Sequence, residues 1–551
     1  MKFNTPGQIG SLTTRNRIVM APMISNLANP DGSTNESHIR YLSERAKGGA
    51  GVIITEYTYI DDMNARGSRN QLSITRDELV PKLRRLTEAI HRYGSLCFVQ
   101  LVHAGGKALR DNERHQFAPT AVDYLGTLPN EMDLEDIRST QESFIAASGR
   151  ARKAGFDGVE LHGAHGYLVQ EFISPALNKR TDRYGGSTEN RLRFVQEIID
   201  GIRGSTETAL GIRLSLYEDD PDGYPPEYGL KCAESLENID YVHFSAGRFA
   251  SPGSTASFYH RAPHIALKLP RKPDITTMVV GSIGSVNAME KALEKSDFVS
   301  IGRGVLADPF FPAKATNMPG TIRPCIRCNQ GCRSLSWGEV RCTVNPETGF
   351  EPVGTYPRFS GDIDIIGGGI KGLEAALYAS KLGFKVRLYE EREQVGGQLN
   401  DIREPMMKEE FVRLVNYYIS VLQLAGVEII TENRGSGSGI FCLPDVIYPH
   451  LPERSEVFVD SAIYMHHDEA LIRAESSHVT MTARSLQYLD RDRAKEFRKI
   501  AESRGIVFSD FDPEVFHDSF MDPDQYDIMR AMNSGRLAVD QYVRGHYNLH
   551  L

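Results

Sequence analysis

The 551-residue chain has no surplus of positive charge and none of the long apolar runs of a membrane protein. Lys and Arg total 63 against 72 Asp and Glu, which gives a formal net charge of −9. An acidic chain offers no broad basic surface for nucleic acid. No run of about eighteen apolar residues occurs, and the N-terminal residues lack the apolar stretch of a secretory signal. These absences predict a cytoplasmic protein without nucleic-acid or membrane partners.

Cysteine is scarce and unevenly distributed. Of the 7 cysteines, Cys97, Cys232 and Cys442 stand far apart, so a disulfide scaffold is not expected. The other four follow the pattern C-x2-C-x3-C-x9-C, and they are Cys325, Cys328, Cys332 and Cys342. Thiolates grouped in this way are ligands either of structural zinc or of an iron–sulfur cluster. Three close cysteines and one more distant cysteine favour a 4Fe–4S cluster.

The region from residue 1 to about 320 alternates short apolar segments with longer amphipathic ones. Eight strands are predicted, with helices such as 77–93 and 189–203 between them. The strands are expected at 18–20, 52–55, 96–100, 158–161, 211–216, 241–245, 277–281 and 298–301. Eight βα units predict an α/β chain with an N-terminal TIM (β/α)8 barrel, whose chemistry lies on the loops after the strands. A doubly wound sheet is the alternative, but the first turn lacks its glycines.

Polar residues and glycines follow most of these strands and are expected to converge at one face of the barrel. They are Pro22, Met23, Glu56, Gln100, His103, His162, His165, Tyr167, Arg213, Gly281, Ser282, Gly302 and Arg303. Glycine-rich turns after the last two strands are where a barrel holds a phosphate with backbone N–H groups. Arg303 adds a positive charge there.

Several of these stretches resemble the old yellow enzyme family. The resemblance runs from Pro6 to about Pro312, and the matching stretches are 16–23, 155–167, 174–178, 180–191 and 301–309. It implies FMN at the mouth of the barrel. It places Pro22 and Met23 beside the isoalloxazine ring, Gln100 and Arg213 at its polar edge, and Gly281, Ser282, Gly302 and Arg303 at its phosphate. Glu56, after the second strand, is counted with the cofactor-binding residues.

His162, His165 and Tyr167 form an H-x-x-H-x-Y segment after the fourth strand. Two imidazoles in this arrangement can donate hydrogen bonds to one substrate oxygen, which prepares the β-carbon of a conjugated alkene for hydride. Tyr167 is then placed to deliver a proton to the α-carbon. A pair of packing or metal-binding histidines is the alternative. Ile24 departs from the family, because many relatives carry there a Thr or Cys that tunes the flavin.

The cysteine pattern narrows the resemblance to the multi-cofactor iron–sulfur branch, which includes 2,4-dienoyl-CoA reductase and trimethylamine dehydrogenase. The barrel then spans 1–320 and the 4Fe–4S segment 321–350. In the relatives that oxidise trimethylamine, a tyrosine stands in place of the first histidine. His162 therefore favours reduction of an activated alkene.

A linker rich in Pro and Gly leads to a second cofactor motif. A strand runs into Gly367, Gly369 and Gly372 of a G-x-G-x-x-G pattern, followed by a helix and a second strand that ends at Glu390. This order predicts a Rossmann-like unit, because an acid at that place binds the ribose hydroxyls of an adenosine. Gly397 and Gln398 resemble the continuation of an FAD site. FAD is the expected ligand, with ADP as the alternative.

The C-terminal region departs from this branch. The region 434–519 should hold an NAD(P)H unit, yet the turn after its first expected strand, 456–463, has no glycine. Side chains in that turn would keep a pyrophosphate from the backbone, so the unit is interpreted as shortened and degenerate. A strand at 478–482 and a helix at 494–505 are expected, and the Gly-Ser run 435–439 predicts a linker. The segment 527–542 resembles the family's return helix, so the FAD unit comprises 361–433 and 520–551.

The predicted function is that of an iron–sulfur flavoenzyme, an ene-reductase that reduces the C=C bond of an α,β-unsaturated carbonyl compound at FMN. Electrons are expected to arrive through the 4Fe–4S cluster and FAD. One alternative is a dehydrogenase that oxidises a small substrate and passes electrons to ferredoxin or an electron-transfer flavoprotein. Another is a non-catalytic electron-relay or regulatory subunit. Relatives are often oligomeric, which makes a homo-oligomer a further expectation.

Overall fold

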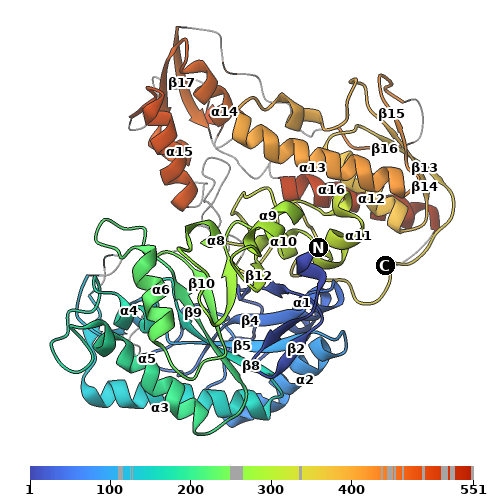
Figure 1. Cartoon of the computed structure of the whole chain (residues 1–551). Coiled ribbons are helices and arrows are strands. Elements are labelled where there is room, and N and C mark those ends of the chain that lie inside the picture. The colour runs from blue at the N-terminus through green and yellow to red at the C-terminus, as the bar shows by residue number, and fades with distance from the viewer. Residues whose placement is uncertain are drawn as a thin grey trace.

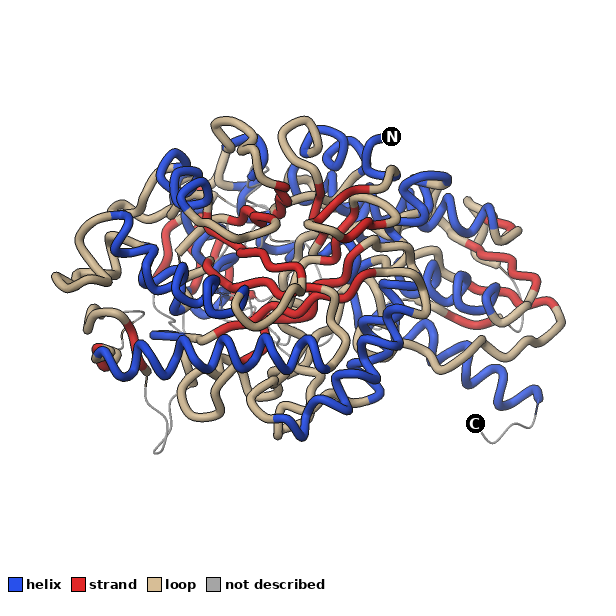
Figure 2. The backbone as a smooth tube through the Cα atoms, turned by 60° about the horizontal axis from the view of Figure 1, so that its bottom comes forward, coloured by secondary structure: helices blue, strands red, loops and turns tan. Residues whose placement is uncertain are grey.

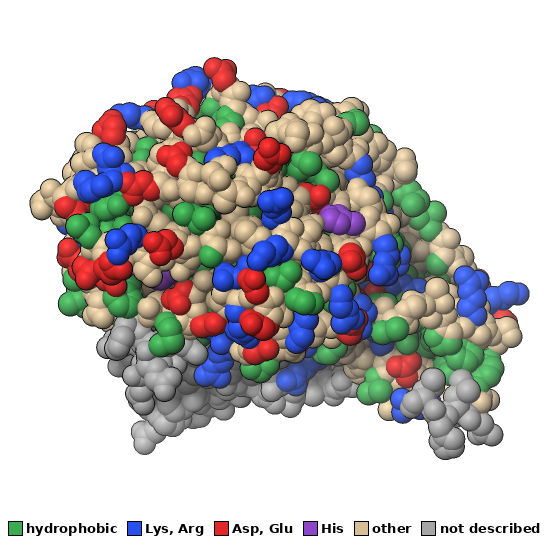
Figure 3. Space-filling view, turned by 90° about the horizontal axis from the view of Figure 1, so that it is seen from below, with side chains coloured by type: hydrophobic (Ala, Val, Ile, Leu, Met, Phe, Trp, Pro, Cys, Tyr) green, Lys and Arg blue, Asp and Glu red, His purple; other side chains and the backbone are tan. Residues whose placement is uncertain are grey.

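The computed structural model describes residues 1–109, 116–123, 126, 128–248, 265–333, 338–435, 439–443, 451, 455–461, 464–486, 491–509, 519–520 and 528–547. A closed barrel forms the N-terminal part of the chain, and two four-stranded parallel sheets follow it (Figure 1). No helix among these residues is long and apolar enough to cross a membrane. Side chains of both charges are interspersed over the face seen in Figure 3.

All eight predicted barrel strands are present and pair in parallel. They are β3 (Ile18–Met20), β4 (Val52–Tyr59), β5 (Leu96–Val102), β8 (Gly158–Gly163), β9 (Ala209–Ser215), β10 (Tyr241–Ser245), β11 (Thr276–Val280) and β12 (Phe298–Ile301). Strand β12 pairs with β3 and closes the ring. The strands are almost wholly buried, as expected where both faces of a parallel sheet are covered. The predicted TIM barrel is confirmed.

Helices surround the barrel (Figure 2). They are α1 (Glu36–Lys47), α2 (Val80–His91), α3 (Leu134–Lys153), α4 (Leu168–Ile173), α5 (Thr188–Arg203), α6 (Pro226–Ser235), α8 (Ile265–Lys268), α9 (Val286–Ala292), α10 (Arg303–Ala307) and α11 (Phe311–Asn317). Local sequence sets their starts: the side chain of Asp133 caps α3, and that of Ser187 caps α5. Helices α2 and α5 match the helices predicted at 77–93 and 189–203.

One end of the barrel is closed by a short hairpin. Its strands are β1 (Gly7–Ile9) and β2 (Leu12–Thr14), and Ile9 packs with Val19, Phe98 and Phe298 in a small apolar group. A second short pair, β6 (Phe117–Ala118) and β7 (Asn130–Glu131), lies in the loop between β5 and α3. The loops after the barrel strands lie at the other end, where the chemistry of such barrels is found.

The segment that carries the four grouped cysteines is fastened to the domains on both sides. Towards the barrel, the buried Arg45 of α1 pairs with Glu351. Towards the C-terminal part, the buried Arg323 donates to the hydroxyls of Tyr417 and Tyr418. The segment therefore connects the barrel to the C-terminal part of the chain through buried contacts on both sides.

The first parallel sheet has the order β15-β14-β13-β16, with β13 (Asp362–Ile366), β14 (Lys385–Tyr389), β15 (Glu428–Ile430) and β16 (Ile440–Phe441). Helices α12 (Ile370–Lys381) and α13 (Pro405–Leu424) connect its strands. Helix α16 (Ile528–Tyr547) packs so closely on α12 that a Cβ at Gly535 would lie 2.2 Å from the carbonyl oxygen of Lys371. The Rossmann-like unit and its returning helix are confirmed. Strand β16 lies in the range 434–519 that was expected to belong to the next unit. Its backbone pairs with β13, so it belongs to the first sheet.

The second sheet has the order β19-β18-β17-β20. Its elements are β17 (Glu456–Ser461), α14 (Tyr464–Arg473), β18 (His478–Thr482), α15 (Arg491–Ser503), β19 (Val507–Ser509) and β20 (Ser519–Phe520). Both sheets share one strand order, which is that of a Rossmann half. The turn at 462–463 and most of the Gly-Ser run, residues 436–438, lie outside the described residues.

Candidate active site

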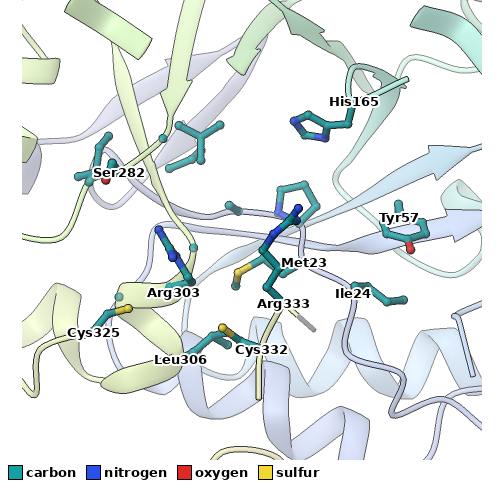
Figure 4. Close-up of a pocket in the computed structure, with 18 of the residues that line it drawn as sticks. Met23, Ile24, Tyr57, His165, Ser282, Arg303, Leu306, Cys325, Cys332 and Arg333 are labelled. Carbon is teal, nitrogen blue, oxygen red and sulfur yellow. The ribbon is translucent and has the colours of Figure 1, made fainter. Parts of the chain in front are cut away.

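A cavity of about 410 Å³ lies at the carboxyl ends of the barrel strands (Figure 4). Most of the predicted site residues line it, and these are Pro22, Met23, His162, His165, Tyr167, Arg213, Gly281, Ser282, Gly302 and Arg303. They come from loops and strand ends spread over almost three hundred residues of sequence. Barrel closure brings them together, as the strand-end argument predicts.

Glu56 and Gln100 do not line this cavity. The buried carboxylate of Glu56 accepts the backbone N–H of Ser25 and, at 3.1 Å, that of Leu72. Glu56 thus fastens the loop that carries Pro22 and Met23. Gln100 donates to the buried Glu160 at 2.7 Å, and its own carbonyl oxygen is buried without a hydrogen-bond partner in the described part of the chain.

The H-x-x-H-x-Y residues form one aromatic group. The ring of His162 lies 5.2 Å from that of His165 at right angles, and 4.7 Å from that of Tyr167. His165 has a left-handed backbone with φ of 60°, which is uncommon outside glycine, and its Nε2 lies 2.7 Å from the hydroxyl of Ser245. The left-handed backbone at this position orients the imidazole of His165 towards the hydroxyl of Ser245.

The electrostatics of the site keep these groups in defined protonation states. Burial, together with the charges of Arg213 and Lys107, holds the pKa values of His162 and His165 well below the ordinary value. Burial also raises the pKa of the Tyr167 hydroxyl. Both imidazoles are therefore neutral at pH 7 and each offers one N–H, while Tyr167 keeps its proton. Arg213, whose pKa burial lowers to about 10, remains a cation.

Several features of the cavity fit a bound flavin. Among its lining residues, the polar atoms with no hydrogen-bond partner in the described part of the chain are Nδ1 of His162 and Nε of Arg213. Buried polar atoms of this kind call for a ligand with hydrogen-bonding edges. At the opposite wall Gly281 has φ of 123°, and a Cβ at Gly302 would lie 3.1 Å from Sδ of Met23. The backbone conformation of Gly281 favours glycine, and the absence of side chains at both positions leaves room for a phosphate at the backbone.

The four grouped thiols surround a second, smaller cavity that adjoins the first. All four line it, and Cys325 and Cys332 also line the larger cavity. The backbone N–H of Arg327 donates to Sγ of Cys325 at 3.4 Å, and the thiol of Cys328 donates to Thr343 at 3.0 Å. In the described residues, no three His, Cys, Asp or Glu side chains are grouped to hold a single metal ion.

Ionisation of these crowded thiols is electrostatically costly without a metal. Burial, followed by the proximity of Cys325 and Cys328, raises the pKa of Cys342 to about 12. Thiols in that environment stay protonated unless a positive centre stabilises the thiolates. The donor set therefore fits a metal cluster shared by the four sulfurs.

The Rossmann-like unit has the backbone of a dinucleotide site. Gly367 has φ of 106°, Gly369 is the N-cap of α12, and a Cβ at Gly372 would lie 1.8 Å from the carbonyl oxygen of Gly367. Glu390, at the end of β14, accepts the N–H of Gly368 at 2.8 Å. These are the tight turn, close packing and acid that an adenosine site requires.

The continuation of the dinucleotide motif lies beside that loop. Gly397 and Gln398 are in a 3-10 helix, Gly397–Asp401. A Cβ at Gly397 would lie 3.0 Å from the Cα of Gly369. The predicted continuation is thus adjacent to the glycine-rich turn, although the two are separated in sequence.

Sequence reasoning missed several residues that line the larger cavity. Tyr57, at the end of β4, lies 5.3 Å from the ring of Tyr167. The others of interest are Lys107, Arg327, Arg333 and Arg413. Lys107 follows a strand end, so its position was detectable from sequence. The three arginines come from the cysteine segment and α13, and only tertiary packing brings them to the barrel.

This fold and site define a flavin-dependent barrel enzyme with an added dinucleotide domain, and comparison with known proteins agrees. The chain belongs to the NADH:flavin oxidoreductase / NADH oxidase family, whose model matches residues 2–319. A model of the NAD(P)-binding Rossmann-like domain matches residues 365–423. The predicted old yellow enzyme family and its multi-cofactor branch are confirmed. The protein is an FMN-dependent oxidoreductase.

Relatives cover most of the chain. NADH oxidase from Thermoanaerobacter brockii is 37% identical over 80% of this chain and 71% of its own length. Cinnamate reductase from Clostridium sporogenes is 31% identical over 77% of this chain and 70% of its own length. A structure of 2-naphthoyl-CoA reductase in complex with 2-naphthoyl-CoA is similar with a TM-score of 0.83 at 22% identity, over 92% of this chain and 87% of that one. The last likeness concerns the fold alone.

Proposed function

We propose that the protein reduces the C=C bond of an α,β-unsaturated carbonyl compound at FMN, with electrons supplied through a 4Fe–4S cluster and FAD. The observation that carries the proposal is the arrangement of two neutral imidazoles and a protonated phenol on one wall of the cavity. A relative named cinnamate reductase, similar over 77% of this chain, adds support. FMN, when bound, supplies a hydride to the substrate's β-carbon.

The chain's own residues supply the rest of the chemistry. His162 and His165 each donate one N–H to the substrate carbonyl oxygen, where negative charge develops. Because both are neutral, they stabilise that charge without giving up a proton. Tyr167, with its raised pKa, keeps its hydrogen until the α-carbon becomes basic enough to take it.

The cofactors would be held by residues already placed. Arg213, Gly281, Gly302 and Arg303 would hold FMN through its ring edge and phosphate. The four thiols that surround the smaller cavity would hold the 4Fe–4S cluster. Gly367, Gly369, Gly372 and Glu390 would hold the adenosine diphosphate half of FAD. A soluble protein donor such as ferredoxin is the proposed partner where NAD(P)H fails to reduce the enzyme.

The test is anaerobic. FMN, FAD, iron and sulfide are measured on one sample, which is then titrated with NADH, NADPH and finally dithionite. The reduced enzyme is mixed with cinnamaldehyde, and reoxidation of FMN is followed by absorbance at the same time as loss of the alkene. Stoichiometric reoxidation with formation of the saturated aldehyde is expected. Reduced FMN that no conjugated alkene reoxidises would contradict the proposal.

A further inference from the structure

One side chain lies at the wall of both cavities. Arg303, which follows β12, lines the larger cavity together with Ser282 and Gly302. It also lines the smaller cavity that the four thiols surround. Figure 4 shows this side chain between Ser282 on one side and Cys325 and Cys332 on the other. The glycine turn proposed for the FMN phosphate and the cysteine segment therefore meet at one guanidinium.

A residue of the cysteine segment holds that guanidinium. Nη1 of Arg303 donates to the amide oxygen of Asn329, a wholly buried side chain that lines the smaller cavity. A guanidinium can only donate, so the direction of this hydrogen bond is fixed. Arginine has five N–H groups in a planar fork, which allows Arg303 to contact Asn329 and a phosphate at the same time.

The loop around Asn329 fixes the position of its side chain. Asn329 has a left-handed backbone with φ of 60°, which asparagine adopts more readily than most residues. The amide oxygen of Gln330 accepts from the hydroxyl of Thr343 at 3.2 Å. The carbonyl oxygen of Gly331 accepts from the backbone N–H of Arg341 at 2.9 Å. Asn329 is thus held by the contacts of the residues that follow it.

A fixed guanidinium binds a phosphate more tightly than a mobile one. An arginine side chain has many rotamers, and ordering them when a ligand binds costs conformational entropy. The hydrogen bond to Asn329 restricts Arg303 before the ligand arrives, so less entropy remains to be lost. Asn329 lies after α11, the last helix of the barrel, and contributes to this restriction from outside the barrel.

We propose that Asn329 is a positioning residue for FMN, which holds Arg303 at the phosphate so that the cysteine segment completes a site the barrel alone does not. This inference rests on the proposed function, because it takes FMN to be the ligand of the larger cavity. It adds to that function a residue that touches neither the flavin ring nor the substrate. The role of Asn329 is exerted through the guanidinium alone.

Comparison of FMN with riboflavin, which lacks the phosphate, isolates this role. The full-length protein is freed of FMN under anaerobic conditions, and iron is assayed so that samples of equal cluster content are compared. The dissociation constants of both flavins are measured by ultrafiltration, with chromatographic analysis of the free flavin. Asn329→Gly removes the amide and suits a left-handed backbone. We expect this variant to bind FMN about tenfold more weakly and riboflavin with unchanged affinity.

A matched control is available on the barrel. Asn238 is an exposed asparagine that also has a left-handed backbone, with φ of 61°. Asn238→Gly makes the same chemical change in the same backbone conformation. It should leave the dissociation constants of FMN and riboflavin unchanged.

A double-mutant cycle tests whether Asn329 acts through Arg303. Arg303→Met keeps most of the alkyl stem and loses every N–H donor, so it should weaken FMN binding more than Asn329→Gly does. In the Arg303→Met protein, Asn329→Gly should cause no further loss of FMN affinity. The same loss with and without the guanidinium would overturn the proposal.

Unchanged FMN affinity in Asn329→Gly would also overturn it, as would an equal loss of affinity for FMN and riboflavin. Reoxidation of the reduced, FMN-saturated enzyme by cinnamaldehyde tests the proposed function separately. An enzyme that reduces the alkene but binds FMN independently of Asn329 overturns the positioning role alone. An enzyme whose FMN affinity depends on Asn329, but which no conjugated alkene reoxidises, overturns the function alone.

Discussion

The hydroxyl oxygen of Ser245 lies 2.7 Å from Nε2 of His165. The same oxygen accepts a hydrogen bond from Nη2 of Arg213 at 3.3 Å. A hydroxyl oxygen can accept two hydrogen bonds or donate one, so the contact with Nε2 holds the His165 ring in either tautomer. Ser245 is therefore a positioning residue that fixes the orientation of His165.

Replacement of Ser245 by Ala should slow alkene reduction without loss of FMN. A less well oriented His165 would lower kcat/KM by roughly tenfold, because small misplacements of a catalytic group are costly. Ser245→Thr retains the hydroxyl and should recover most of the rate. Steady-state kinetics with an enal, on samples matched for FMN content, check this expectation. A Ser245→Ala enzyme with unchanged kcat/KM would show that the contact is structural only.

Removal of the Tyr167 hydroxyl should separate the two halves of the reaction. Tyr167→Phe cannot supply the proton to the α-carbon, so reoxidation of reduced FMN by the alkene should fall by about 10²–10⁴. Reduction of FMN by dithionite involves no proton from this residue and should be unaffected. Stopped-flow absorbance measures both steps, and Tyr93→Phe, at an exposed position, is the control. Reoxidation at the normal rate would exclude Tyr167 as the acid.

The barrel and most of its site could be predicted because each element is recognisable from its local sequence. Strands such as β9 and β10 are short apolar segments, and the carboxyl ends of barrel strands lie together at one face. The H-x-x-H-x-Y segment, which begins in β8, was located by the same rule. The glycines of the Rossmann-like unit were predictable for the same reason, since only glycine fits at Gly372.

The residues that were missed depend on contacts between domains. Arg413 lies on α13, and its approach to the barrel cavity is fixed by Glu410 and the cysteine segment rather than by local sequence. The misplaced boundary near β16 has a similar origin, because a two-residue strand is recognised only by the strand it pairs with. The family resemblance places Gln100 at the polar edge of the flavin, and Glu56 is counted with the cofactor-binding residues. Neither lines the larger cavity, and their side chains contact Glu160 and the backbone of Ser25.

Loss of a cavity-lining thiol should remove the cluster. Cys332→Ser deletes one of four sulfurs around the smaller cavity, and we expect iron and sulfide content to fall by more than about half, since cubanes need four ligands. Cys232→Ser, which replaces a buried thiol of α6 far from the segment, should retain both. Chemical analysis and the visible absorbance of the anaerobic protein measure the effect. Full iron content in Cys332→Ser would contradict the assignment of this ligand.

The Gly372 position should tolerate no side chain. Its Cβ would lie 1.8 Å from the backbone oxygen of Gly367, so Gly372→Ala must displace the turn that approaches a pyrophosphate. We expect loss of the bound adenine nucleotide and destabilisation of roughly 1–3 kcal/mol. Gly545→Ala, in α16 with nothing within 4 Å, should be neutral or slightly stabilising. Nucleotide release on denaturation and thermal unfolding are the measurements. Normal nucleotide content in Gly372→Ala would rule out this turn as its site.

The buried carboxyl of Glu171 should make the stability of the protein depend on pH. Burial raises its pKa from 4.5 to about 8, so the folded protein binds its proton more tightly than the unfolded chain does. The resulting stabilisation is fully present below about pH 4.5 and is lost as the pH rises through about 8. Over this interval the free energy of unfolding should fall with rising pH.

Glu171→Gln isolates this effect, because the amide can still accept the N–H of Gly106 but cannot titrate. Denaturant unfolding between pH 5 and 8.5 should show a shallower decline in the variant, with the difference on the order of a few kcal/mol at the alkaline end. Glu56 and Glu218, whose pKa values burial also raises to about 7, leave a residual slope in both proteins. Glu135→Gln, at an exposed position on α3, is the matched control and should follow the unmodified protein. Parallel pH profiles for Glu171→Gln and the unmodified protein would mean that Glu171 titrates normally, and Lys107 would then face a charged carboxylate at neutral pH.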